Sequence, residues 1–388
     1  MHQPAKLKEL EKINPFRVMT VMHRAAALEA EGRKIVHMEV GEPDFKTATP
    51  IIEAAKNALD AGFTHYTAAA GIDELRNTLA GHYLERYGVT VDKERILVTP
   101  GASGGLSLLA NLLVGEGDGV LITDPAYPCV RNFIQLMNAS PKLVPVGRSQ
   151  NFQPTVQQLE GAADSNTCGV WLASPSNPTG SVLDREALAD ISSWCSDKSL
   201  HLLVDEIYHG LHYVDDLPSV LEIDDSAFVV NSFSKYFGMT GWRLGWIVVP
   251  DYAVDKASIL AQNFYISPSS IAQHAALAGF TEATRLILEQ RRQNFRERRD
   301  FLCASLREIG FVLAEEVQGA FYVYADISAF SENSEQFCHD MLENHGVAIT
   351  PGTDFGDFKA RQFVRFAFTT SMDDLALGVE RLRRALQG

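Results

Sequence analysis

Short apolar runs alternate with helical patterns through the middle of the chain, and this alternation limits the possible folds more than any other feature. Five such runs each end in a polar residue, a glycine or a proline; they span residues 96–100, 119–125, 168–175, 200–206 and 227–234. Strands that alternate with helices form a mainly parallel sheet, which helices cover on both faces. We therefore expect an α/β fold whose functional residues lie at the carboxyl ends of the strands.

The pattern changes after about residue 285. Residues 286–310 predict one long amphipathic helix, residues 319–327 and 363–369 resemble strands, and residues 373–388 predict a terminal helix. These elements indicate a smaller α+β domain that follows the parallel sheet.

The charge of the chain limits its partners. Its 34 basic and 49 acidic residues give a net charge of −15, which argues against nucleic acid and an anionic membrane. The sequence has no run of about 18 apolar residues, and its N-terminus lacks the apolar region of a signal peptide. Five scattered cysteines without C-x-x-C spacing indicate reduced thiols. We therefore expect a cytoplasmic protein, and, because no histidine spacing fits a metal site, we expect no metal.

Lys235 lies in the segment SFSKYFGMTGWRLGW, residues 232–246. A Schiff base needs an unprotonated amine, and apolar neighbours and a nearby cation lower the pKa of a lysine. Ser232, Ser234 and Arg243 also supply the hydroxyl groups and the guanidinium that suit a phosphate monoester. These residues predict a lysine that binds a phosphorylated aldehyde cofactor, a description that fits pyridoxal phosphate. The alternative is a solvated surface lysine, which is the usual state of an isolated lysine in a serine-rich turn.

Three other motifs follow predicted strands. Residues 99–106 join a strand to a helix through glycines, and the backbone N–H groups there, with Ser103, form an anion site. This segment lacks the spacing of triphosphate and dinucleotide loops, and a glycine-rich turn often serves only tight packing. The loop SPSNPTGS, residues 174–181, is on its own merely a turn. Asp205 ends a buried run, and its alternative role is to cap a helix.

The pattern S-x-S-K-x-x-x-x-x-G-x-R-x-G, the N-P-T-G motif at 177–180 and VDEIYHG at 204–210 together resemble the class I/II aminotransferases, which are fold type I enzymes that depend on pyridoxal phosphate. The resemblance runs from about residue 14 to residue 384 and is strongest to bacterial aspartate and aromatic aminotransferases. It implies a large cofactor-binding domain at 46–284, a discontinuous small domain at 1–45 and 285–388, and at least a homodimer.

The resemblance also implies roles for individual residues. Lys235 would hold pyridoxal phosphate as a Schiff base and then act as the base that moves the substrate proton. Asp205 would pair with the pyridine nitrogen, Asn177 and Tyr208 would contact the phenolic oxygen, and Tyr127 would stack on the ring. A carboxylate beside the ring nitrogen keeps that nitrogen protonated, which makes the ring a stronger electron sink.

The remaining implied contacts concern the cofactor phosphate and the substrate. The other cofactor-binding residues are Gly101, Ala102, Ser103, Ser232, Ser234 and Arg243, with Tyr66 reaching the neighbouring subunit. Arg365 and the backbone of Gly41 would hold the substrate α-carboxylate, close to Asn177. A guanidinium binds a carboxylate in a bidentate manner that a lysine does not reproduce.

The predicted substrate pocket favours a neutral amino donor. Residues 103–105 read Ser-Gly-Gly where some members of the subgroup carry a lysine for a distal carboxylate, and residues 262–270 contain no basic residue. Phe16, Val18 and Met19 occupy the entry segment and favour an apolar side chain. We expect a donor with an aromatic or aliphatic side chain and a 2-oxo acid acceptor.

Arg17 is the one candidate residue for binding a distal carboxylate of the substrate, and such a role would argue against a neutral donor. Its alternative is a solvent-facing arginine. Two other functions remain open. A carbon–sulfur β-lyase on the same fold would release pyruvate and a thiol without an acceptor acid. A ligand-sensing aminotransferase-like module would not need the full catalytic set, and an acidic chain does not favour DNA binding.

Overall fold

The computed structural model describes residues 10–13 and 15–387 and contains a mostly parallel seven-stranded sheet. β8 is antiparallel to its neighbours β2 and β7, and the other pairs are parallel. In spatial order the strands are β2 (Ile96–Thr99), β8 (Gly245–Val248), β7 (Phe228–Ser232), β6 (His201–Asp205), β5 (Thr167–Ala173), β3 (Gly119–Asp124) and β4 (Ser140–Pro145).

The expected α/β fold is confirmed, and two strands of the large sheet, β4 and β8, were not predicted. The five apolar runs correspond to β2, β3, β5, β6 and β7. β4 is an edge strand that contains Pro141 and is only partly buried, so it lacks a continuous apolar pattern. β8 begins within the Lys235 segment, at Gly245, and was not recognised as a separate strand.

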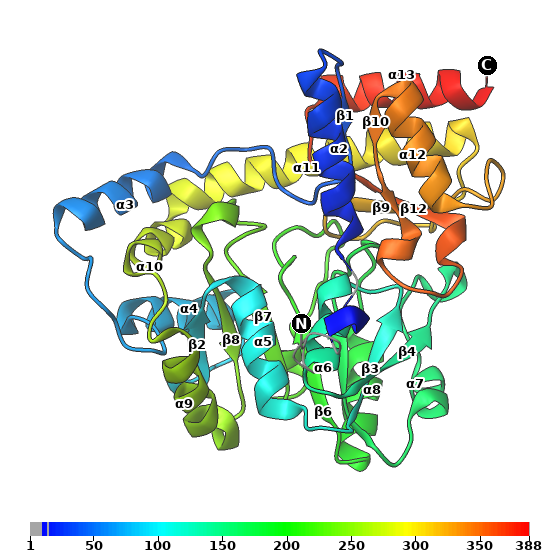
Figure 1. Cartoon of the computed structure of the whole chain (residues 1–388). Helices are drawn as coiled ribbons and strands as arrows, with labels where there is room; N and C mark the ends of the chain where they lie inside the picture. The colour runs from blue at the N-terminus through cyan, green and yellow to red at the C-terminus, as the bar shows by residue number, and fades with distance from the viewer. Residues whose placement is uncertain (1–9, 14, 388) are drawn as a thin grey trace, which may run out of the picture.

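Helices cover both faces of this sheet (Figure 1). Alternate residues of a strand face opposite sides: in β6, Leu202 and Val204 belong to one apolar cluster and Leu203 to the other. On the Leu203 side pack α5 (Gly101–Leu113), α6 (Pro128–Leu136) and α9 (Val254–Tyr265). On the other side pack α4 (Asp73–Tyr87), α7 (Val156–Ala162), α8 (Arg185–Asp197) and α10 (Ser270–Leu277), with α3 (Thr49–Asp60) beside α10.

Two smaller sheets lie above the large one in Figure 1. β1 (Val36–His37) pairs in parallel with β10 (Val347–Ala348), so the beginning of the chain packs with its end. β12 (Phe363–Ala367) is antiparallel to both β11 (Thr350–Pro351) and β9 (Tyr322–Asp326). The accompanying helices are α2 (Arg17–Ala30), α11 (Glu282–Ile309), α12 (Ser334–His345) and α13 (Met372–Gln387).

This arrangement determines where the chain can form a site. The strands of the large sheet fall between residues 96 and 248, and those of the small sheets fall at 36–37 and 322–367. The division at residues 45 and 284 remains a prediction. No helix among residues 10–13 and 15–387 is both long and apolar enough to cross a membrane.

Candidate active site

A cavity of about 390 Å³ lies where β5, β6 and β7 end, below α2 and β12. It brings together residues that are far apart in the sequence. Of the predicted site residues, it is lined by Gly41, Ala102, Ser103, Tyr127, Asn177, Asp205, Tyr208, Ser232, Ser234, Lys235, Arg243 and Arg365. These positions agree with the expectation that functional residues gather at the carboxyl ends of parallel strands.

Lys235 follows β7 and projects into the cavity. Its Nζ donates a hydrogen bond to the carbonyl oxygen of Gly41 at 2.7 Å. Burial, and then the charge of Arg365, lowers the pKa of Lys235 to about 8, although the charge of Glu42 opposes the shift. A lysine with a lowered pKa has a larger unprotonated fraction near neutral pH, so this amine is suited to attack an aldehyde.

Of the residues predicted to hold phosphate, Gly101, Ala102 and Ser103 begin α5, and Ser232, Ser234 and Arg243 line the same cavity as Ala102 and Ser103. Gly101 does not line the cavity, but a Cβ atom on it would lie 2.6 Å from Nη2 of Arg243. The guanidinium therefore rests against the backbone of Gly101, whose φ of +71° also favours glycine. The backbone N–H of Ser234 donates to Oγ of Ser232 at 3.0 Å. A cation, two hydroxyl groups and a helix N-terminus form a site that fits a phosphate monoester.

Asp205 is the last residue of β6 and is almost fully buried. The backbone N–H of Ile207 donates to its Oδ1 at 3.1 Å. Burial raises the pKa of Asp205 to about 7, while the bond from Ile207 and the charge of Lys235 oppose the shift. A cation placed beside this carboxylate would relieve the cost of burying it. The protonated ring nitrogen of pyridoxal phosphate is such a cation.

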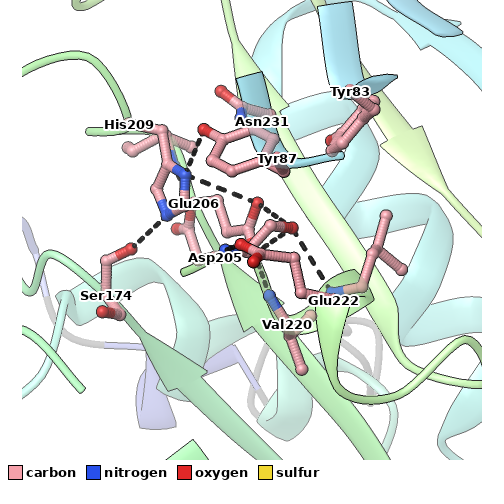
Figure 2. A network of polar contacts seen from close by, with 12 residues as sticks. Tyr83, Tyr87, Ser174, Asp205, Glu206, His209, Val220, Glu222 and Asn231 are labelled. Carbon is pink, nitrogen blue, oxygen red and sulfur yellow. Dashed lines mark hydrogen bonds and ion pairs between the residues drawn. The ribbon is translucent and has the colours of Figure 1, made fainter. Parts of the chain in front are cut away.

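A buried polar network beside Asp205 holds the turn after β6 in place (Figure 2). Nε2 of His209 lies 3.1 Å from the carbonyl oxygen of Ser174, which can only accept, so this nitrogen carries the proton. Nδ1 then accepts a hydrogen bond from the hydroxyl group of Tyr87 at 2.7 Å. The carboxylate of Glu206 accepts from the backbone N–H of Val220 at 2.8 Å. The network links the segment 205–209 to the beginning of the loop that carries Asn177.

Arg365, on β12, is buried beside Asn177. Nη1 donates to Oδ1 of Asn177 at 2.9 Å, and Nη2 donates to the carbonyl oxygen of Glu39 and, at 3.4 Å, to Oγ1 of Thr350. Within the described part of the chain, the buried Nε of Arg365 has no hydrogen-bond partner. A guanidinium that is fixed by neutral oxygens and retains a free donor is suited to bind a carboxylate.

Tyr322 is a site residue that the sequence did not reveal. Its hydroxyl group lies 3.0 Å from that of Tyr208, and its ring lies 4.2 Å from Cζ of Arg365. The segment around it predicted only a strand, and Tyr324 lies on the same face of that strand. The sequence alone therefore offered no signal that distinguished these two tyrosines.

Besides Gly101, two predicted residues do not line the cavity. Tyr66 is 80% exposed and does not line it. The guanidinium of Arg17 forms an ion pair with Glu335, and its backbone N–H donates to Oδ1 of Asp354 at 2.8 Å. Arg17 lines a neighbouring cavity instead. In this structure it is therefore not placed to bind a distal carboxylate of the substrate, because the first turn of α2 directs its side chain away from the site.

Part of the cavity lining is apolar, and we call this part the apolar wall. Its side chains come from α2, from Phe16 directly before it, and from three other segments: Phe16, Val18, Met19, Met22, Val40, Leu106 and Ile207. Among the described residues, the cations that line the cavity are Lys235, Arg243 and Arg365.

The geometry agrees with comparisons to known proteins. A model described as aminotransferase class I and II matches residues 33–382. The chain is 38% identical to the valine–pyruvate aminotransferase of Mycobacterium tuberculosis, over 95% of this chain and 96% of that protein. It is 33% identical to an aspartate aminotransferase of Pyrococcus horikoshii, over 97% and 96% of the two chains. The crystal structure of an aminotransferase from M. tuberculosis matches over 100% of both chains, with a TM-score of 0.95 and 37% identity. The chain belongs to the aminotransferase class I and II family.

Proposed function

We propose that this aminotransferase binds pyridoxal phosphate through Lys235 and transfers an amino group, in a ping-pong reaction, between a neutral L-amino acid and a 2-oxo acid. The observation that carries the proposal is the set of cations in the cavity. Lys235 is placed for an aldehyde, Arg243 for a phosphate and Arg365 for an α-carboxylate. No cation that lines the cavity in the described part of the chain is left for an acidic side chain.

Each residue has a defined part in this reaction. Bound pyridoxal phosphate supplies an aldehyde and a conjugated ring that accepts electron density from the substrate Cα. Asp205 holds a positive charge at the ring nitrogen, and Asn177 and Tyr208 donate hydrogen bonds to the phenolic oxygen. Arg365 orients the α-carboxylate, and Nζ of Lys235 takes the proton from the substrate Cα. Tyr127 covers the ring, and the apolar wall excludes water from the reacting atoms.

The donor side chain faces Phe16, Val18 and Met19 in this proposal. An apolar wall offers no compensation for a buried carboxylate, so an acidic donor would lose its hydration without a partner. The relatives do not select one substrate by themselves, since one is named for valine and pyruvate and another for aspartate. We therefore propose an aromatic or aliphatic donor on the basis of the cavity.

The proposal includes a cytoplasmic homodimer with shared active sites. The exposure of Tyr66, outside the cavity of its own chain, supports its contact with the cofactor phosphate of a second copy. The net charge of −15 supports small-molecule substrates rather than nucleic acid or a membrane surface. The five cysteines, none of which forms a disulfide, are compatible with a reducing compartment.

A donor screen on the purified holoenzyme tests the proposal. Phenylalanine, leucine, alanine and aspartate are compared with pyruvate and 2-oxoglutarate as acceptors, and Lys235→Ala serves as the inactive reference. We expect neutral donors to react faster than aspartate and the variant to lose covalently bound cofactor. Faster use of aspartate would contradict the neutral donor, and wild-type rates in Lys235→Ala would contradict the role of the lysine. Release of pyruvate from cystathionine without an acceptor would indicate a β-lyase.

A further inference from the structure

We propose that Asp354 is a positioning residue that sets how strongly the enzyme distinguishes large from small neutral donors. Its carboxylate holds the first turn of α2, and that turn presents the apolar wall to the substrate side chain. This inference rests on the proposed function, because it concerns the donor side chain. It names a residue that does not itself line the catalytic cavity.

The contacts of Asp354 show that it caps α2 from a distant part of the chain. Oδ1 accepts the backbone N–H of Arg17 at 2.8 Å, and Oδ2 accepts that of Val18 at 3.4 Å. The residue at the N-cap position, Phe16, provides no side-chain cap. Asp354 thus satisfies two of the free N–H groups of the helix, and its negative charge matches the positive end of the helix dipole. It is only 8% exposed, which strengthens both effects.

The beginning of α2 carries part of the apolar wall of the cavity. Phe16, Val18, Met19 and Met22 all line it. The ring of Phe16 also meets the ring of Tyr127 edge-on, with centroids 6.1 Å apart. A shift of the first turn would therefore move the surface that a leucine or phenylalanine side chain contacts. An alanine side chain is too short to gain as much from this wall.

The segment that contains Asp354, residues 350–354, connects the apolar wall to Arg365, the arginine proposed to bind the α-carboxylate. Thr350 lies opposite Arg365 where β11 pairs with β12, and its Oγ1 accepts a hydrogen bond from Nη2 of Arg365. Asp354 is the last residue of the short helix η8 (Gly352–Asp354), which directly follows β11. Only three residues, 351–353, therefore lie between Thr350, which contacts Arg365, and Asp354, which caps α2. This short link fixes the space available to a donor side chain between the two.

A second contact of the first turn of α2, the ion pair between Arg17 and Glu335, provides a control. The guanidinium of Arg17 pairs with Glu335, which also accepts a hydrogen bond from Oγ1 of Thr353 at 2.9 Å. This pair is exposed, and such pairs contribute little. Glu335→Gln weakens the tie to the Arg17 side chain without removing either backbone bond to Asp354.

The test measures KM and kcat of the holoenzyme for alanine, leucine and phenylalanine in Asp354→Ala, Asp354→Asn and Glu335→Gln. We expect Asp354→Ala to raise KM for leucine and phenylalanine about five- to tenfold, the scale of a lost helix cap. KM for alanine should change less than about twofold on the same reasoning. Asp354→Asn retains one acceptor oxygen, so its KM for leucine and phenylalanine should lie between those of the wild-type protein and Asp354→Ala. Glu335→Gln should keep the wild-type ratios of KM between the three donors.

The outcomes separate positioning from general stability. An equal loss for all three donors, or unchanged ratios in Asp354→Ala, would overturn the proposal. If Asp354→Ala does not fold, as judged by its melting curve, Asp354→Ser replaces it, because its hydroxyl group accepts one of the two bonds. A wild-type preference for aspartate would contradict the proposed function, but the ratio of leucine to alanine would still report on Asp354.

Discussion

The hydroxyl groups of Tyr208 and Tyr322 lie 3.0 Å apart, although Tyr208 follows β6 of the large sheet and Tyr322 begins β9 of a small one. Both tyrosines line the cavity, and Arg365 lies over the ring of Tyr322. This contact joins the part of the site that would bind the phenolic oxygen of the cofactor to the part that would bind the substrate carboxylate.

We expect Tyr322→Phe to impair substrate binding more than stability. The variant removes a hydrogen bond that is worth about 1 kcal/mol and leaves the ring beneath Arg365. KM for the amino donor should rise about three- to tenfold, as measured by steady-state kinetics. Tyr324→Phe is the matched control, because Tyr324 is also buried on β9 but does not line the cavity. Equal effects of the two variants on KM would argue against a role for the Tyr322 hydroxyl group in the site.

Arg365→Lys should lower kcat/KM about 30- to 150-fold, because a lysine keeps the charge but loses one of two charge-assisted bonds worth about 2–3 kcal/mol. Arg361→Lys, on the exposed segment before β12, should have no such effect. The measurement is the kcat/KM of each variant with one donor and one acceptor. A loss below about threefold in Arg365→Lys would show that the carboxylate is bound elsewhere.

The pKa of Lys235, about 8, predicts how cofactor-free protein takes up pyridoxal phosphate. Only the unprotonated amine reacts, so the rate of appearance of bound cofactor should rise with pH and level off above about 8, and fall about tenfold per pH unit well below it. Because the charge of Arg365 lowers this pKa, Arg365→Gln should move the profile to higher pH, whereas Arg365→Lys should not. A profile that continues to rise toward pH 10 would contradict the lowered pKa.

Glu206 should make stability depend on pH. Burial raises the pKa of Glu206 to about 8, from 4.5 for a glutamate in water. The folded state therefore binds a proton more tightly than the unfolded state, and the stabilisation present below pH 4.5 is lost as the pH rises toward 8. Glu206→Gln should melt at a higher temperature than the wild-type protein at pH 8 to 9, with a smaller difference at pH 5.

Glu316 is exposed, and Glu316→Gln is the control for this experiment. Its melting temperature should depend on pH in the same way as that of the wild-type protein. A Gln side chain can still accept from Val220 and donate to Ser219, so the buried network is retained. If the difference in melting temperature between the wild-type protein and Glu206→Gln stays constant from pH 5 to 9, Glu206 does not titrate in this range.

The local sequence determined many of the helices and strands of this protein and several residues of its candidate site. The five apolar runs, the turn residues after them and the long helix were readable because each depends on side-chain periodicity within one segment. Lys235 was identified from the residues around it, and Asp205 and Asn177 from motifs that resemble those of the aminotransferases. Because strand ends in a parallel sheet lie at one edge, their positions in the chain also predict that they meet. β4 was missed because its own sequence is weakly patterned. β8 was missed although it is apolar, because its first two residues were assigned to the Lys235 segment.

Only the tertiary structure decided which side of each distant segment faces the cavity. Tyr322 reaches Tyr208 across 114 positions, and Asp354 caps Arg17 across 337 positions. Contacts of this kind depend on how segments from distant parts of the chain pack together, and no local pattern encodes that packing. The same physics directed the side chain of Arg17 to Glu335 and left Phe16 and Val18 facing the cavity. The sequence therefore determined the chemical groups of the site, and the packing of the small sheets against the large one decided the shape of the pocket between them.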